Sequence, residues 1–191
     1  MALLPGCAEG VGVSGAKTLR LGLALAALAL MGVLAASASA TSRSETNLPT
    51  LNHQVLVALN RFRVAHGLVP LRESASLDRS ARLHSLEMGR VGYFGHPSAN
   101  GTAFWRRIER FYTNTNYSYW SVGENLLWAP AGVSGGHAMQ MWIDSPPHLA
   151  NLLASRWRQI GISAVSVVHA PGVYGGRDIV LITTDFGVRR Q

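Results

Sequence analysis

The 191-residue sequence predicts an α+β fold in which helices cover an antiparallel sheet. Between residues 51 and 155, apolar residues in several segments recur every three or four positions, as they do along one face of an amphipathic helix. From residue 160 the pattern changes to two runs rich in β-branched residues, which favours strands. Because helices come first and strands last, the order favours an antiparallel sheet over a doubly wound parallel one.

The first forty residues predict an export signal. Lys17 and Arg20 precede the apolar run LGLALAALALMGVLAA, and the Ala-Ser-Ala of residues 38–40 fits an A-x-A cleavage site. The run is short for a membrane span, and small residues follow it instead of a basic stop-transfer flank, so a removed signal is favoured over a retained anchor. Residues 1–40 are therefore assigned to a signal peptide. This predicts a protein that is secreted, periplasmic or held in the cell envelope.

The remaining chain is basic and has no cysteine. The whole sequence has 17 Lys and Arg against 10 Asp and Glu, and without Lys17, Arg20 and Glu9 the balance is 15 against 9, a net charge of about +6. Such a surface favours anionic partners such as phospholipid headgroups or wall polymers. The only cysteine, Cys7, lies in the predicted signal, which excludes disulfides and thiol chemistry from the folded domain. No nucleic-acid motif occurs, and no nucleic-acid partner is expected.

The folded part is predicted to begin with a helix. Residues 41–50 are polar and predict a flexible lead-in. Apolar residues then fall at helical spacing from Leu51 to Phe62. Gly67 and Pro70 end this pattern, as a helix stop does.

A second helix is predicted to follow Ser74 or Ser76, either of which can cap it, and to end before Gly92. One apolar stripe recurs at intervals of three and four residues: Leu77, Ala81, His84, Met88 and Val91. His84 on this stripe is expected to be a hydrogen-bonded core residue.

A third amphipathic stretch, TAFWRRIERFY at residues 102–112, has two interpretations. It is either an ordinary amphipathic helix, which is favoured, or a surface that rests on a membrane. In the second case aromatic side chains would enter the lipid and three arginines would meet headgroups: Arg106, Arg107 and Arg110.

The rest of the chain predicts two helices and a hairpin. Residues 137–145 predict one helix, and the prolines that open residues 146–155 predict the start of a short second one. Residues 160–168 and 178–188 predict strands, with the glycines and proline of residues 169–177 as the hairpin connection. The second strand is apolar enough to be central.

Three polar residues are the candidate site: His96, Glu124 and His148. We expect all three in loops or at element ends, where scaffolds present functional groups. Glu124 stands in the apolar segment SVGENLLWAP and needs partners if it is buried, which two imidazoles would supply. Two histidines and a carboxylate also suit zinc or another divalent cation. The alternative is a buried polar network that pins loops together without binding anything.

Several ordered motifs resemble the bacterial branch of the CAP superfamily of cysteine-rich secretory, antigen 5 and pathogenesis-related proteins. They are LNRFRVAHGLVPL, ARLHSLEMGRVGYFGH, GENL, MWIDSPPHLANLL and TTDFG. The resemblance covers nearly the whole mature chain and assigns a CAP-like domain to residues 51–188. It implies an α-β-α sandwich with a small antiparallel sheet flanked by helices.

The resemblance also implies a cleft with two histidines and two acids. By motif, His96 and His148 match the histidines and Glu124 the acid of GEN, while Gln140 stands at the position taken for the second acid. A neutral amide has no negative charge, so the departure at Gln140 weakens the case for a divalent ion held by His96 and His148. Asn151 is expected to hold a loop through hydrogen bonds.

The sequence therefore predicts a secreted CAP-domain protein that binds a divalent ion or small polar group in the cleft, or a lipid or cell-wall-derived ligand in a neighbouring apolar groove. The alternative is a metal-assisted hydrolase of esters or peptides, in which His96 and His148 hold the ion and Glu124 is the general base. Residues 132–136 match G-x-S-x-G, but no buried strand of a parallel sheet precedes Ser134, so a serine nucleophile is rejected. A structural envelope component is the third alternative.

Overall fold

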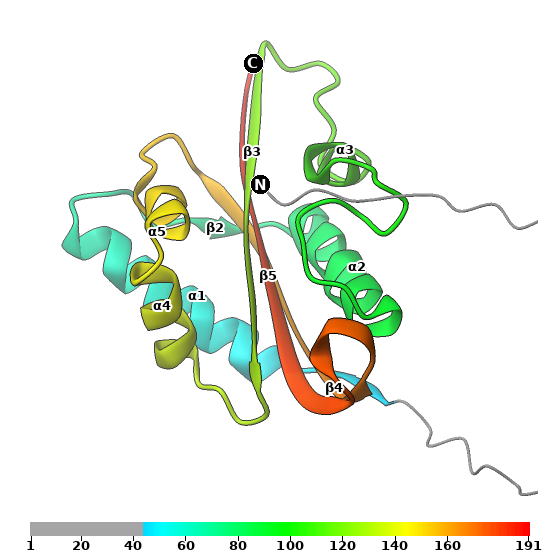
Figure 1. The fold of residues 1–191 in the computed structure, drawn as a ribbon. Coiled ribbons are helices and arrows are strands. Elements are labelled where there is room, and N and C mark those ends of the chain that lie inside the picture. The colour runs from blue at the N-terminus through cyan, green and yellow to red at the C-terminus, as the bar shows by residue number, and fades with distance from the viewer. Residues whose placement is uncertain (1–43) are drawn as a thin grey trace, which may run out of the picture. The chain divides into compact units, whose positions relative to one another are not determined.

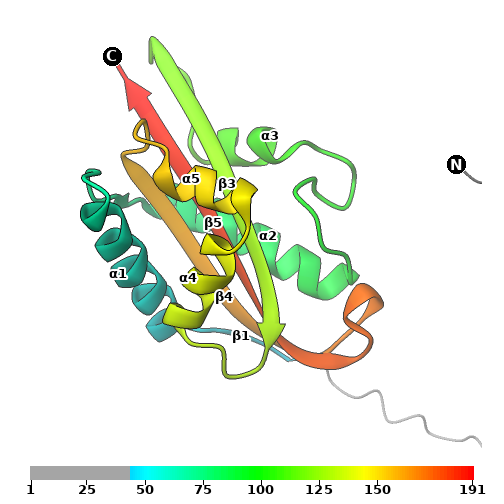
Figure 2. The same cartoon turned by 60° about the vertical axis from the view of Figure 1, so that its left-hand side comes forward.

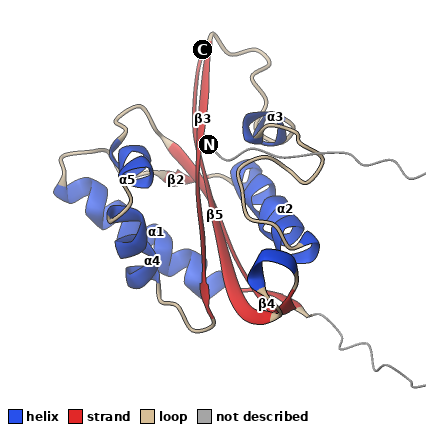
Figure 3. Ribbon diagram, viewed as in Figure 1, coloured by secondary structure: helices blue, strands red, loops and turns tan. Residues whose placement is uncertain are grey.

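The computed structural model describes residues 44–191, and the predicted signal peptide, residues 1–40, lies outside this range. Figures 1 and 3 show helices on both faces of one sheet. The elements in chain order are β1 (Glu45–Asn47), α1 (Pro49–Ala65), β2 (Arg72–Glu73), α2 (Ala75–Val91), α3 (Phe104–Glu109), β3 (Tyr119–Pro130), α4 (Gly135–Ile143), α5 (Pro146–Leu153), β4 (Gln159–Ala170), a 3-10 turn (Gly172–Tyr174) and β5 (Arg177–Arg190). No helix within residues 44–191 combines the length and the apolar character needed to cross a membrane.

The sheet has the strand order β1-β4-β5-β3, and β2 pairs with β4 beside this path. All pairs are antiparallel except β2 with β4, which is parallel. Helices α2 and α3 lie on one side of the sheet, and α1, α4 and α5 lie on the other (Figures 1 and 2). This arrangement confirms the α-β-α sandwich.

Strand β5 is central and apolar on both faces, as its sequence predicts. Val180 and Ile182 pack in the core that contains α1, α4 and α5, whereas Ile179 and Leu181 pack with Met88 of α2. Alternate side chains of a strand point to opposite faces, so a strand between two helical layers favours apolar residues on both faces.

Helix α2 ends where its sequence predicts. Gly92 has a φ of 83°, a left-handed conformation that glycine adopts without strain, and its N–H donates to the carbonyl of Met88. The helix lies directly against β4, because a Cβ atom placed on Gly161 would come within 2.1 Å of the carbonyl carbon of Leu77. Glycine at 161 therefore permits this close approach.

Two expectations about local structure differ from the observed fold. Part of the expected lead-in is ordered: β1 pairs with Ser166 and its neighbours, and Pro49 begins α1. A strand joined through backbone hydrogen bonds needs no apolar pattern, so composition alone does not reveal it. The third amphipathic stretch forms a helix of only six residues, in which Arg107 and Ile108 are buried. A membrane face that includes Arg107 is therefore wrong.

Candidate functional site

Glu124 lies in the middle of β3, opposite Asp185 of β5, and its side chain is fully buried. The expectation that Glu124 occupies a loop is therefore wrong. The polar residues of GEN interrupt the apolar alternation, which makes this part of a strand look irregular in the sequence. Gly123 allows β3 to pack closely against Trp157, because a Cβ atom at position 123 would lie 2.8 Å from the Trp157 ring.

The Glu124 carboxylate has two strong partners. Its Oε1 accepts a hydrogen bond from His96 Nδ1 at 2.8 Å, and its Oε2 pairs with the guanidinium of Arg107. The pairing of His96 with Glu124 follows the sequence hypothesis. Arg107 was missed, because a basic residue in an amphipathic stretch is more often solvated than buried.

Arg107 also fixes the segment that carries His96. Its guanidinium is 1% exposed and donates to the carbonyl oxygen of His96 at 3.1 Å. The same nitrogen lies 3.4 Å from the Ser98 hydroxyl. Arg107 thus neutralises the buried carboxylate and holds the backbone beside it, so that the His96 ring meets Glu124 while half of the ring faces solvent.

His148 lies in the first turn of α5 and is held there by two asparagines. Asn125 Nδ2 donates to the His148 carbonyl oxygen at 3.1 Å. Asn151 Nδ2 in turn lies 2.9 Å from Asn125 Oδ1 and 3.1 Å from the Glu124 carbonyl oxygen. These bonds tie α5 to β3, so the segments GENL and MWIDSPPHLANLL are joined in one structure.

The His148 ring has an unusual polar environment. Burial, and the neighbouring charge of His96, lower the pKa of His148. Its Nδ1 is buried and has no hydrogen-bond partner in residues 44–191. The lowered pKa favours the neutral ring, and Nδ1 is a buried polar atom without a partner in the described part of the chain.

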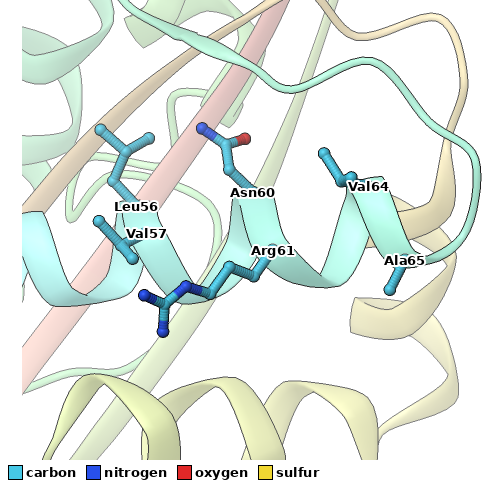
Figure 4. A pocket seen from close by; sticks show the side chains of 6 residues that line it. All are labelled: Leu56, Val57, Asn60, Arg61, Val64 and Ala65. Carbon is cyan, nitrogen blue, oxygen red and sulfur yellow. The ribbon is translucent and has the colours of Figure 1, made fainter.

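An apolar cavity of about 240 Å³ begins at His148. It is lined by Phe94, Leu126, Leu127, Trp128, Met141, Trp142, Ser145 and His148. The polar cluster and the apolar cavity therefore meet at a single imidazole. A larger apolar cavity of about 580 Å³ is formed by six residues of α1 alone and shares none of these residues (Figure 4).

The structure does not bring Gln140 to this cluster. Gln140 is exposed on α4, and its Nε2 donates to Asp144 Oδ1 at 2.7 Å. Trp142, two positions later, is fully buried and donates to the Leu126 carbonyl. Two residues of an α-helix are about 200° apart, so a buried Trp142 turns Gln140 toward solvent.

Asp185 and His84 complete the buried surroundings of Glu124. Asp185 is fully buried, and desolvation together with the Glu124 charge raises its pKa well above the usual value, which favours its protonated form. His84, as expected, is a buried core residue: its Nε2 lies 2.9 Å from the Gly95 carbonyl oxygen. The same Nε2 is 4.0 Å from Glu124 Oε2. The lone acid in the largely apolar segment IVLITTDFGV, residues 179–188, was the signal for Asp185.

The donor set does not fit a metal site that uses Glu124. Both carboxylate oxygens are engaged by nitrogen donors, and the positive charge of Arg107 opposes a cation beside them. In residues 44–191, no three His, Cys, Asp or Glu side chains are grouped to hold a metal ion. His96 and His148 are the two remaining donors at this place.

Comparisons with known proteins agree with the fold and the motifs. Residues 56–174 match the model of the cysteine-rich secretory protein family, CAP. An uncharacterized Bacillus subtilis protein, YkwD, is 26% identical over 125 residues, which are 65% of this chain and 46% of YkwD. The chain therefore spans less than half of that relative's length.

Two solved structures have the same fold. An extracellular protein from Bacillus anthracis that contains an SCP domain has a TM-score of 0.56 at 25% identity, over 75% of this chain and 41% of its own. An outer surface protein from Borrelia burgdorferi has a TM-score of 0.61 at 18% identity, over 78% of this chain and 100% of its own. The second likeness supports the fold alone. With the family match over most of the described residues, the chain belongs to the cysteine-rich secretory protein (CAP) family.

Proposed function

We propose that this CAP domain binds an amphiphilic ligand, a lipid or an amphiphilic cell-wall fragment, at the junction of the polar cluster and the apolar cavity. The observation that carries the proposal is the position of His148. Its ring lines the cavity of about 240 Å³, while its buried Nδ1 lacks a hydrogen-bond partner within residues 44–191. A ligand with a polar group at His148 Nδ1 and an apolar part in the cavity would pair with the unpartnered nitrogen and fill the apolar space.

His96 would bind the polar group of the ligand from the solvent side. Its ring is 49% exposed, and the bond from Nδ1 to Glu124 leaves Nε2 for the ligand. The related proteins from Bacillus anthracis and Borrelia burgdorferi are described as extracellular and outer surface proteins. Together with the signal predicted at residues 1–40, they support a location in or outside the cell envelope, where such amphiphiles occur.

Thermal unfolding with decanoate and decanol as probes tests this binding. We expect the melting temperature to rise with probe concentration, since a ligand that binds only the folded state stabilises it. His148→Ala should abolish the rise. His53→Ala changes an exposed histidine on α1 and is the matched control, which should keep it. An equal rise in both variants, or none in the unmodified chain, would contradict the proposal.

A second candidate is hydrolysis, favoured by the bond between His96 and Glu124. A carboxylate that accepts from Nδ1 orients an imidazole and stabilises its protonated form, so His96 rather than Glu124 would be the general base toward water.

Hydrolysis of p-nitrophenyl acetate with and without added zinc distinguishes a zinc-dependent hydrolase from a metal-free one. Turnover that needs zinc would favour an ion held by His96 and His148. Turnover without zinc that is lost in His96→Ala would favour the metal-free base. Equal turnover in His96→Ala would exclude both.

A further inference from the structure

A second concave site lies at the end of the sheet where β2 joins β4. Its cavity is about 440 Å³ and is lined by Val69, Pro70, Arg72, Arg158, Gln159 and Arg189. Three of these six side chains are guanidinium groups. None of the six lines the cavity beside His148, so the two sites use different residues.

The strand pairing brings the three arginines together from distant parts of the chain. Arg72 of β2 is opposite Gln159 of β4, and its N–H donates to the Arg158 carbonyl oxygen at 3.0 Å. The N–H of Arg158 donates to the Gly187 carbonyl oxygen of β5 at 3.1 Å, two residues before Arg189. The convergence is therefore built into the sheet.

The positive charge of this cavity is not neutralised by the chain itself. None of the ion pairs formed within residues 44–191 includes Arg72, Arg158 or Arg189. Like charges around a concave surface focus a positive potential and raise the local concentration of anions. An anionic ligand would remove this repulsion.

The polar groups at the cavity are also hydrogen-bond donors. The Tyr112 hydroxyl donates to Gln159 Oε1 at 2.6 Å, which leaves the NH₂ group of that amide for a ligand. The Arg189 guanidinium lies 3.9 Å from the centre of the Tyr112 ring, and this stacking limits its movement. Arg158 is held by carbonyl oxygens, since its Nη1 donates to Ser155 and Trp157. A set of oriented donors without an acidic partner selects an anion with several acceptor oxygens.

We propose that this cavity binds a phosphate group, as a free phosphate ester or as part of a lipid headgroup. Guanidinium groups match phosphate oxygens with paired, parallel N–H bonds, and three of them surround one concave space here. The inference does not depend on the function of the His96 cluster.

Calorimetric titration of the purified chain with glycerol 3-phosphate, and sedimentation with phosphatidylglycerol and phosphatidylcholine vesicles, test the proposal. The double variant Arg72→Gln, Arg189→Gln removes two guanidinium groups from the cavity. The control Arg61→Gln, Arg82→Gln removes the same charge from exposed positions on α1 and α2. We expect the cavity variant to bind at least about tenfold more weakly, since it loses charge-assisted hydrogen bonds to the phosphate. The control should change little.

The two probes distinguish the sources of the phosphate. Binding of glycerol 3-phosphate that is lost in the cavity variant supports recognition of a free ester. Binding only to phosphatidylglycerol vesicles, again lost in that variant, supports recognition of a headgroup. An equal loss of binding in the control variant would assign the binding to net charge and overturn the proposal. Binding to neither glycerol 3-phosphate nor phosphatidylglycerol vesicles would also overturn it.

Discussion

Arginine has opposite surroundings in the Glu124 cluster and in the cavity lined by Arg72, Arg158 and Arg189. Arg107 is buried, and both a carboxylate and a backbone carbonyl compensate its charge. Arg72 and Arg158 are exposed and face a shared cavity without an acidic partner. A buried charge has to be compensated when the chain folds, whereas an exposed one is stabilised by water until a ligand replaces that water. Arg107 thus stabilises the fold around the Glu124 cluster, whereas the arginines of the second cavity remain available to a ligand.

The largest expected effect comes from the buried pair. Arg107→Ala leaves the Glu124 charge buried without its main partner, and breaking such a pair costs about 3–5 kcal/mol of the free energy of unfolding. Arg106→Ala is the matched control, because Arg106 is 63% exposed and lies 4.0 Å from Glu109. It should cost less than about 1 kcal/mol. Urea denaturation of the two variants measures both values, and equal losses would contradict the compensated pair.

A smaller effect is expected at the contact between β3 and α5. Gly123→Ala places a methyl group 2.8 Å from the Trp157 ring and 3.2 Å from Asn151 Oδ1. Overpacking of this kind costs about 1–3 kcal/mol. Gly136 of α4 has no atom within 4 Å of an added Cβ, so Gly136→Ala should stabilise the domain by about 0.5–1 kcal/mol. Opposite signs in urea denaturation would show that Gly123 is selected for close packing, and a stabilising Gly123→Ala would refute it.

The sequence predicted more of the scaffold than of the charge network. Apolar periodicity located the helices and strands β4 and β5, because burial imposes that spacing, but it did not reveal β3, which is as long as β4. The pairing of His96 with Glu124 was also within reach, since a carboxylate in apolar company requires partners. The roles of Arg107 and Asp185 could not be predicted from the sequence, because they depend on contacts between distant parts of the chain. Asp185 faces Glu124 only through the register of β3 and β5.

The protonation of Asp185 should appear as a pH dependence of stability. Its pKa is raised in the folded state, so folding requires a proton that the unfolded chain releases above pH of about 4. Stability due to this group is therefore lost as the pH rises through that value toward the folded-state pKa. Asp185→Asn removes the requirement, so its stability relative to the unmodified chain should increase as the pH rises above about 4. The pKa of Asp78 is raised to about 6, so this residue also makes the free energy of unfolding depend on pH. It does so equally in both proteins, and its contribution cancels when the two free energies are subtracted. A difference that is constant with pH would mean that Asp185 is ionised.

The smallest effect on stability is expected in the arginine cavity, although its effect on binding is large. Arg72→Gln relieves repulsion with Arg158 and Arg189 but removes no buried contact, so the free energy of unfolding should rise by less than about 0.5 kcal/mol. The gain should disappear when salt is raised toward 1 M, where the screening length falls to about 3 Å. Urea denaturation at low and high salt measures it, with Arg82→Gln as the exposed control on α2. A loss of stability at low salt would instead mean that Arg72 has a structural role like that of Arg107, and the contrast between the two sites would fail.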